Sequence, residues 1–235
     1  MSSKMKIALF LLLVCILVLC NVMSCCNSSS DNVNQDPCAK IADDAVEAAF
    51  KGQSSFADSL FNRAFACDTK VAISSLSLLV DSILETDDWN SALTWSDKLI
   101  QFAETADDTV GIATGYFYFG GAQSRSGKQA EALDAYEKAI SLFRKFPPTE
   151  VFASTIKSLG AVHLRLGNFQ AAREAFWECR SLREKSKSLG NVSDVYVSIG
   201  NYYDELAQRD SANYWYLRGL KQAKREKDLK AHANS

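Results

Sequence analysis

The side chains of this chain that are best suited to chemistry are its seven cysteines and two histidines. No two cysteines have the C-x-x-C spacing of a structural zinc site, and only His163 and His232 are available to complete one. Cys179 and His163 are the one combination that suits a thiolate nucleophile activated by an imidazole. The periodicity described below assigns both to helix packing, where a thiol behaves as a small apolar side chain. We therefore expect no catalytic residue, no metal site and no cofactor.

A segment with two glycines, from Gly121 to Lys128, approaches the pattern of a phosphate-binding loop. Ala122 stands where that motif needs its first glycine, and Gln129 stands where it needs the Ser or Thr that binds Mg²⁺. The chain also has a formal net charge of −2 and no continuous basic stripe. Both facts disfavour phosphate chemistry and nucleic-acid binding. We expect neither a nucleic-acid partner nor a small-molecule substrate.

The elements that position these residues repeat along the chain with a period of 40. Glycines recur at Gly120, Gly160 and Gly200, and each is followed at constant spacings by an alanine, then an aromatic residue and then a small one. Apolar residues at helical spacing flank a break at Gly127-Lys128 in one unit and at Gly167-Asn168 in the next. Each unit is therefore predicted to be a pair of antiparallel helices that approach closely where one helix is thin. A long fixed period is typical of stacked-repeat proteins, whose extended surfaces bind partners.

The order of residues within each unit resembles the tetratricopeptide repeat (TPR). Its aromatic, large apolar, glycine, turn, alanine, aromatic and small positions are matched by Tyr116, Phe119, Gly120, Gly127, Ala132, Tyr136 and Ala139, and again by Ile156, Leu159, Gly160, Gly167, Ala172, Phe176 and Cys179. The usual family period is about 34, so the chain resembles a long-helix variant. The resemblance implies an all-α, right-handed solenoid of antiparallel helix pairs, a TPR-like superhelix over residues 38–235. About five hairpins are expected, at about 38–68, 69–107, 108–147, 148–188 and 189–229. Val80 takes the glycine position in the second of them, so we expect that unit to pack more loosely.

In this family the first helix of each unit lines a concave groove that binds protein or peptide partners. By register, the groove residues expected here are Phe117, Gly121, Arg125, Lys157, Ala161, Arg165, Asn201 and Asp204. They lack the paired lysines and asparagines with which chaperone-binding members hold a terminal carboxylate. Arg125 and Arg165 occupy the same position in successive units and have two possible roles. They either pair with an acidic or phosphorylated segment of a partner or bridge to Asp204 and Glu205, and the bridge is the favoured interpretation.

The first 24 residues have the pattern of a secretory signal peptide. Lys4 and Lys6 precede an unbroken apolar run from Ile7 to Cys20, and 14 helical residues reach about 21 Å, which is short of the roughly 30 Å of a bilayer core. The following Val22-Met23-Ser24-Cys25 resembles a bacterial lipobox, in which the cysteine receives lipid. We therefore expect a signal peptide at 1–24, lipid on Cys25 and a flexible polar tether over 25–37. A soluble secreted form cut near Ser24 and an uncleaved anchor are the alternatives.

Export would leave Cys38 and Cys67 free to form a disulfide. If helices at about 39–50 and 54–67 form a hairpin that turns at Lys51-Gly52-Gln53, the two cysteines lie level at its open end. A disulfide closing this loop of about 30 residues would stabilise the hairpin by roughly 3–4 kcal/mol. The alternative is two unrelated small buried residues.

Charge is distributed unevenly, with 10 basic and 18 acidic residues over 25–146 and 14 basic and 10 acidic over 147–235. The basic end either docks on an anionic lipid or acidic partner or is a solvated terminal helix that caps the last repeat. The latter is the favoured interpretation.

These features predict a non-catalytic, membrane-anchored TPR scaffold that binds a protein or peptide partner at the bacterial cell envelope. The lipid on Cys25 would supply the membrane contact. The alternatives are a sensory or regulatory input module acting on a separate output protein, and a soluble secreted TPR protein.

Overall fold

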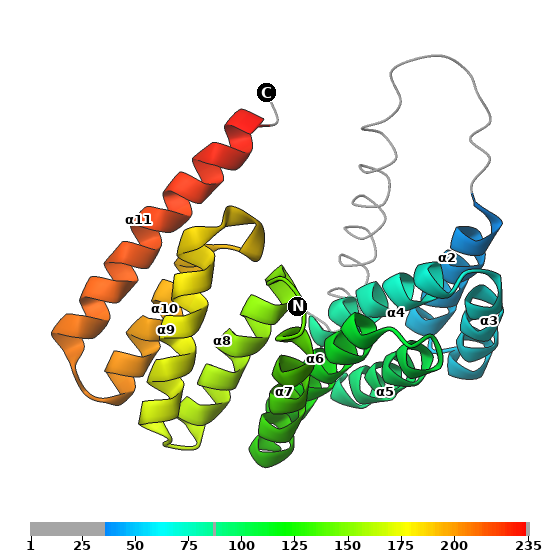
Figure 1. The fold of residues 1–235 in the computed structure, drawn as a ribbon, viewed down its shortest axis with the longest axis horizontal. Coiled ribbons are helices and arrows are strands. Elements are labelled where there is room, and N and C mark those ends of the chain that lie inside the picture. The colour runs from blue at the N-terminus through cyan, green and yellow to red at the C-terminus, as the bar shows by residue number, and fades with distance from the viewer. Residues whose placement is uncertain (1–35, 87, 234–235) are drawn as a thin grey trace. The chain divides into compact units, whose positions relative to one another are not determined.

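The computed structural model describes residues 36–86 and 88–233, and the side chains of these as far as residue 227. The chain divides into two units, Met1–Asp36 and Pro37–Ser235, and everything that follows concerns the second. Within the described ranges the regular structure is helical: α2 (Pro37–Phe50), α3 (Ser54–Cys67), α4 (Thr69–Leu84), α5 (Trp89–Thr105), α6 (Thr109–Arg125), α7 (Gln129–Phe143), α8 (Glu150–Arg165), α9 (Phe169–Lys185), the 3₁₀ turn η1 (Lys187–Leu189), α10 (Val192–Glu205) and α11 (Arg209–Ala233). The helices pair in chain order as hairpins from α2–α3 to α10–α11, and neighbouring hairpins pack on each other (Figure 1). This is an all-α solenoid of helix hairpins, which confirms the predicted fold class.

Short turns separate the two helices of each hairpin. Gly127 and Gly167 have φ of 86° and 74°, the left-handed conformation that closes a helix C-terminus. After α10 a non-glycine residue, Ala207, takes the same role at φ 57°, at a cost of about 1 kcal/mol. Several helices then begin at an oxygen-bearing side chain: Asp108 Oδ1, for example, accepts from the amides of Val110 and Gly111 at 3.1 and 2.9 Å.

The repeating glycines lie where the two helices of a hairpin cross. A Cβ built on Gly120, Gly160 or Gly200 would lie 2.9 Å from Tyr136, 2.8 Å from Phe176 or 2.4 Å from Tyr216, in each case a ring carbon. The ring of the second helix therefore rests directly on the backbone of the first. This contact is the physical reason for the constant spacing between glycine and aromatic residue.

In the second hairpin the larger residue of this pair is on the first helix and the smaller one is on the second helix. Val80 stands at the glycine position and Ser96 at the aromatic position, and both side chains are fully buried. The first hairpin follows the ordinary arrangement, because Ala45 and the buried Phe61 stand at the glycine and aromatic positions with the usual spacing. We infer that the larger first-helix side chain is accommodated by the smaller second-helix one, in place of the looser packing expected from Val80 alone.

Besides Gly120 and the groove residue Gly121, helix α6 has two further glycines, Gly111 and Gly115, that the 40-residue register does not explain. A Cβ on Gly115 would lie 2.5 Å from Ile100 Cγ1, and one on Gly111 would lie 2.9 Å from the Cβ of Ala103. Helix α6 is thus thin towards both α5 and α7. Glycine costs about 1 kcal/mol per residue in a helix interior relative to alanine, and tight packing on both sides offsets this cost.

The first and last hairpins have additional ties. Cys38, in the first turn of α2, and Cys67, the last residue of α3, are joined as a disulfide with their Cα atoms 5.6 Å apart. At the other end, Glu226 of α11 accepts from the amides of Val192 and Ser193 at 3.0 and 3.3 Å. A carboxylate from one helix therefore caps the N-terminus of α10.

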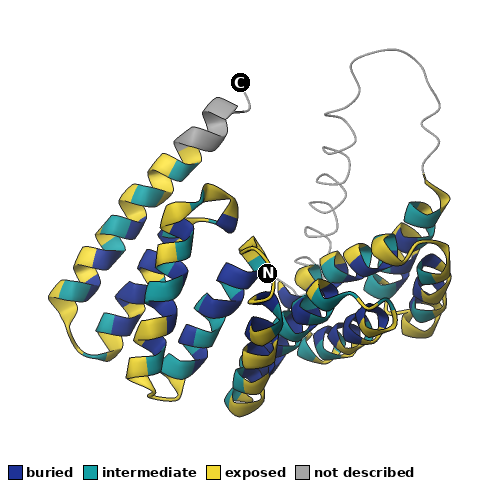
Figure 2. Ribbon diagram, in the orientation of Figure 1, coloured by how far each residue is buried: buried dark blue, intermediate teal, exposed yellow. Residues whose placement is uncertain are grey.

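Buried and exposed residues alternate along the helices (Figure 2). Two large clusters form most of the core, one over α2–α6 and the other over α6–α10 with Trp215 of α11. None of the described helices is long and apolar enough to cross a membrane. Cys25 and the predicted signal peptide lie outside the described residues.

Candidate partner-binding groove

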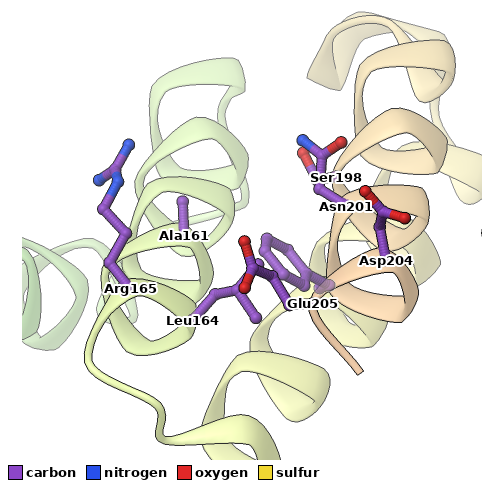
Figure 3. A pocket seen from close by; sticks show the side chains of 8 residues that line it. Ala161, Leu164, Arg165, Ser198, Asn201, Asp204 and Glu205 are labelled. Atoms are coloured by element: carbon purple, nitrogen blue, oxygen red, sulfur yellow. The ribbon is translucent and has the colours of Figure 1, made fainter. Parts of the chain in front are cut away.

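Two adjoining hollows run along the first helices of successive hairpins. One, of about 430 Å³, lies between α8 and α10, and the other, of about 260 Å³, lies between α4, α6 and α8. Ala161 and Arg165 line both, so the hollows form one continuous groove. Figure 3 shows the first hollow, with Ala161, Leu164 and Arg165 on one side and Ser198, Asn201 and Asp204 on the other.

Most of the groove residues expected from the register line these hollows. Phe117, Gly121 and Arg125 line the hollow between α4, α6 and α8, and Asn201 and Asp204 line the one between α8 and α10, in addition to the two shared residues. The exception is Lys157, which lines neither. It occupies the same stripe of α8 as Ala161 but one turn nearer the N-terminus, where α8 faces the start of α10. Its Nζ lies 3.9 Å from Asp194 Oδ2, and burial lowers the pKa of its ammonium group.

The two groove arginines both reach back to the preceding repeat. Arg125 Nη1 donates to the carbonyl of Leu84, the last residue of α4, and its guanidinium lies 5.4 Å above the Trp89 ring. Arg165 Nη1 donates to Ser124 Oγ at 2.7 Å. In the 40-residue register the acceptor residues Leu84 and Ser124 are equivalent. Each arginine thus joins its helix to the first helix of the unit before it.

This arrangement corrects one interpretation of the sequence. Within the described residues neither arginine forms an ion pair of 4.0 Å or less with Asp204 or Glu205. The hydrogen bonds above direct both guanidinium groups towards the preceding unit. The acids at α10 belong to the following unit, so the favoured bridge does not form.

The charges of the groove alternate along its length. Asp81 of α4 and Glu85, which follows that helix, line one end, Arg125 and Arg165 the middle, and Asp204 and Glu205 the other end. Burial and the neighbouring Glu85 raise the pKa of Asp81, although Arg125 opposes them. The acids at the two ends therefore favour cationic groups, while the middle favours an anionic one.

The register interpretation missed several lining residues. Asp81 and Glu85 are the equivalents, one unit earlier, of Gly121 and Arg125, so extending the groove register to the second unit identifies them. Tyr136 and Phe176 belong to second helices, whose side chains the groove pattern does not include. They reach the groove floor because the glycines beneath them have no side chain, and the Tyr136 hydroxyl lies 3.8 Å from the Cβ position of Gly121. Burial raises the pKa of Tyr136 to about 12, so it is a neutral hydrogen-bonding group there.

The residues considered for catalysis have separate partners. Cys179 is fully buried, its thiol donates to the carbonyl of Ala153 at 3.1 Å, and burial raises the pKa of that thiol. His163 Nδ1 instead lies 3.5 Å from Asn168 Nδ2. The described residues contain no group of three or more His, Cys, Asp or Glu side chains that could hold a metal ion. Cys179 therefore acts as a small core residue.

Comparison with known proteins agrees with this geometry. Residues 152–186, which cover the α8–α9 hairpin, match the family model described as tetratricopeptide repeat. This hairpin is therefore similar to a tetratricopeptide repeat. No curated protein sequence matches the chain.

Several solved structures have a fold similar to that of the chain. BtubC (BKLC) from P. vanneervenii has a TM-score of 0.63 at 15% identity, over 80% of each chain. A signal transduction ATPase with a tetratricopeptide repeat sensor, from Pyrococcus horikoshii, has a TM-score of 0.60 at 17% identity, over 81% of this chain and 30% of that one. A Rap protein complexed with competence and sporulation factor has a TM-score of 0.50 at 17% identity, over 81% of this chain and 66% of that one. At such identities the likeness concerns the fold alone.

Proposed function

We propose that this protein is a non-catalytic scaffold that holds an extended segment of a protein or peptide partner in the groove along α4, α6, α8 and α10. The observation that carries the proposal is the continuity of the groove: two hollows on four first helices share Ala161 and Arg165. An extended segment suits this geometry better than a compact ligand, because the groove crosses several repeats and is open to solvent along them. The Rap protein of similar fold, which is complexed with a factor, lends support to the proposal.

The groove also suggests the chemistry of the bound segment. Within the described residues the hydrogen bonds of Arg165 use Nη1 alone, which leaves Nη2 for a carboxylate or phosphate. Asp81 and Glu85 on one side, and Asp204 and Glu205 on the other, suit basic residues. We therefore expect a segment with an acidic residue at its centre and basic residues on either side.

We further propose that a lipid on Cys25 anchors the protein to the bacterial cell envelope. The support is the sequence alone: the charged and apolar N-terminal run and the Val22-Met23-Ser24-Cys25 motif. The polar residues up to 37 would then hold the repeats away from the bilayer.

Site-specific photo-crosslinking tests the groove. A photoreactive residue replaces Ala161, which both hollows share, and separately replaces Glu137, an exposed residue of α7 that lines neither hollow. In cells, the probe at 161 should give a discrete partner adduct that is absent with the probe at 137.

Charge reversal then tests the assigned chemistry. Arg165→Glu should abolish the adduct, whereas Arg63→Glu, at an exposed arginine of α3, should leave it intact. Equal adducts from positions 161 and 137 would refute the groove as the binding site. An adduct that survives Arg165→Glu would refute the acidic centre of the ligand.

A further inference from the structure

The last helix, α11, carries large apolar side chains at positions that face solvent. Tyr214, Leu217 and Leu220 have exposed fractions of 56, 67 and 57%, and each lies three residues from the next, so they are neighbours on the helix surface. Three basic residues continue the same side of the helix at spacings of three and four: Lys221, Lys224 and Arg225. We call these six residues the α11 patch.

The equivalent positions in earlier second helices are mostly polar where they meet solvent. Exposed polar residues stand at the position of Tyr214 (Thr94, Asp134 and Glu174) and, in two repeats, at that of Leu217 (Asp97 and Glu137). Leu220 corresponds to Ile100 and Ile140, which are buried, whereas no further helix follows α11 among the described residues. The end of a repeat stack normally has a polar outer face. A solvated capping helix therefore accounts for the basic residues of the patch but not for its leucines.

The charge around the patch has one sign. From Tyr214 to Lys227 the sequence has five basic residues and one acidic residue. That acid, Glu226, is turned towards α10, where it accepts from the first amides of the helix. The three basic residues of the patch are exposed and form no ion pair of 4.0 Å or less within the described part of the chain. The patch is therefore complementary to an anionic surface.

A hollow of about 420 Å³ lies beside these charges. Its lining includes the cations Arg218, Lys221 and Arg225 and the rings of Tyr196 and Tyr214. Arg218 is already engaged, because its guanidinium lies 4.8 Å above the Tyr196 ring and 3.9 Å from a carboxylate oxygen of Glu184. Lys221 and Arg225, one helical turn apart, remain available to bind a phosphate group.

The order of residues around the helix distinguishes a bilayer from a protein partner. At 100° per residue, apolar and basic residues of the patch alternate around the axis in the order Leu220, Lys224, Leu217, Lys221, Tyr214 and Arg225. A protein pocket that buried the leucines would also bury the cations between them, which is costly unless each cation is paired. At a bilayer surface, long basic side chains keep their charges among the phosphates while neighbouring leucines enter the acyl boundary.

We propose that the α11 patch docks on the surface of an anionic phospholipid bilayer. Leu217 and Leu220 enter the boundary between headgroups and acyl chains, and Lys221, Lys224 and Arg225 contact lipid phosphates, one of which occupies the hollow. The patch shares no residue with the lining of the proposed groove. The proposal also does not depend on a lipid at Cys25, because the contact uses side chains of α11 alone.

Sedimentation with lipid vesicles tests the proposal. The full-length chain is mixed with vesicles of phosphatidylcholine, either alone or with added phosphatidylglycerol. We expect tighter binding to the anionic vesicles, and this affinity should fall at least about tenfold in the double variant Leu217→Glu, Leu220→Glu. The matched control is Phe56→Glu with Leu78→Glu, at apolar residues of α3 and α4 that are 56 and 68% exposed. It should bind as the wild type does.

A second pair of variants tests the role of charge. Lys221→Glu with Arg225→Glu should lower the affinity for anionic vesicles at least about tenfold and remove most of its dependence on salt. Lys128→Glu with Lys145→Glu changes the net charge equally at two exposed lysines outside the patch and should have a much smaller effect. Circular dichroism melts of every variant ensure that a loss of binding is not a loss of fold.

Hydrogen exchange locates the contact even where the N-terminal residues already hold the chain on the vesicles. Backbone amides of α11 should exchange more slowly on anionic vesicles than on phosphatidylcholine alone, whereas those of α7 should exchange equally on both. Three results would overturn the proposal. Equal exchange of α11 on both kinds of vesicle would exclude an anionic bilayer as its partner. Affinity unchanged by Leu217→Glu, Leu220→Glu would place the contact elsewhere. Concentration-dependent dimerisation that this variant abolishes, without vesicle binding, would make the patch an interface between copies.

Discussion

The crossing of α8 and α9 allows a sharp test of how size is matched between helices. A Cβ on Gly160 would lie 2.8 and 2.9 Å from two ring carbons of Phe176 and 3.2 Å from the Cβ of Ala175. Valine at 160 adds that atom and two methyl groups against a ring that is 1% exposed, so overpacking should cost about 3 kcal/mol. The better helix propensity of valine returns roughly 0.4 kcal/mol. We expect Gly160→Val to lower the free energy of unfolding by about 2.5 kcal/mol.

The compensating change follows from the second hairpin, where Val80 and Ser96 are both fully buried at these positions. Phe176→Ser alone empties a buried ring volume and should cost about 3–5 kcal/mol. The double variant Gly160→Val, Phe176→Ser recreates the Val80 and Ser96 arrangement. Because the valine then occupies space that the ring has vacated, the cost of the double variant should fall about 2 kcal/mol below the sum of the single changes.

Urea denaturation followed by circular dichroism gives the four free energies of the double-mutant cycle. A distant pair, Gly160→Val with Phe61→Ser, is the control, because these residues lie in different hairpins and core clusters. If Gly160→Val and Phe176→Ser were additive within about 0.5 kcal/mol, as expected only of independent sites, the size-exchange reasoning would be refuted. The milder pair Gly160→Ala and Phe176→Leu gives the same test if a single variant does not fold.

Three other predictions concern the two ends of the chain. Cys25→Ser should lose both fatty-acid label in metabolic labelling and recovery in the membrane fraction, and an unlabelled, soluble wild type would contradict the anchor. Cys38→Ser with Cys67→Ser removes the disulfide of the first hairpin and should speed proteolysis of α2–α3 by about 100-fold or more. The later repeats should stay protected from proteolysis. Equal loss of protection throughout the chain would contradict a local role of the disulfide. Burial raises the pKa of Glu226, but hydrogen bonds from Ser193, Gln222 and the backbone outweigh burial and lower the pKa below 4.5. The ionised carboxylate therefore stabilises the fold at pH values above 4.5, and this stabilisation is lost as the pH falls through the lowered pKa. Glu226→Gln should therefore cost about 1 kcal/mol at pH 7 and nothing in strong acid, which denaturation at several pH values measures; a cost that is independent of pH would refute the capping role.

How much of the fold could be predicted from the sequence depends on which features are local. Gly127 and Gly167 end helices through their own backbone conformation, and the recurrence of Gly120, Gly160 and Gly200 marks helix crossings. The periodicity of each helix can be recognised from the spacing of apolar residues that are close together in the sequence. Helix pairs and the fold class therefore follow from the pattern alone.

The candidate groove could be predicted only in part, because a register assigns a face and not a partner. Ala161 and Arg165 lie on the groove stripe as expected, but Lys157, on the same stripe, meets Asp194 of the next repeat instead. A long, flexible side chain such as lysine can point towards an acceptor on a neighbouring helix. The location of that acceptor depends on the angle between successive repeats.

The tertiary structure alone decided the features that join residues far apart in the chain. Arg125 reaches the end of α4, one whole repeat earlier, and Glu226 caps α10 from α11. Val80 and Ser96 are both fully buried in the second hairpin, which the 40-residue register alone does not establish. The sequence by itself determined the helices and their repeat, because these depend on local backbone preference and on one apolar stripe per helix. The stacking of hairpins decided the rest, because side chains that meet across repeats compete for the same space and the same hydrogen-bond partners.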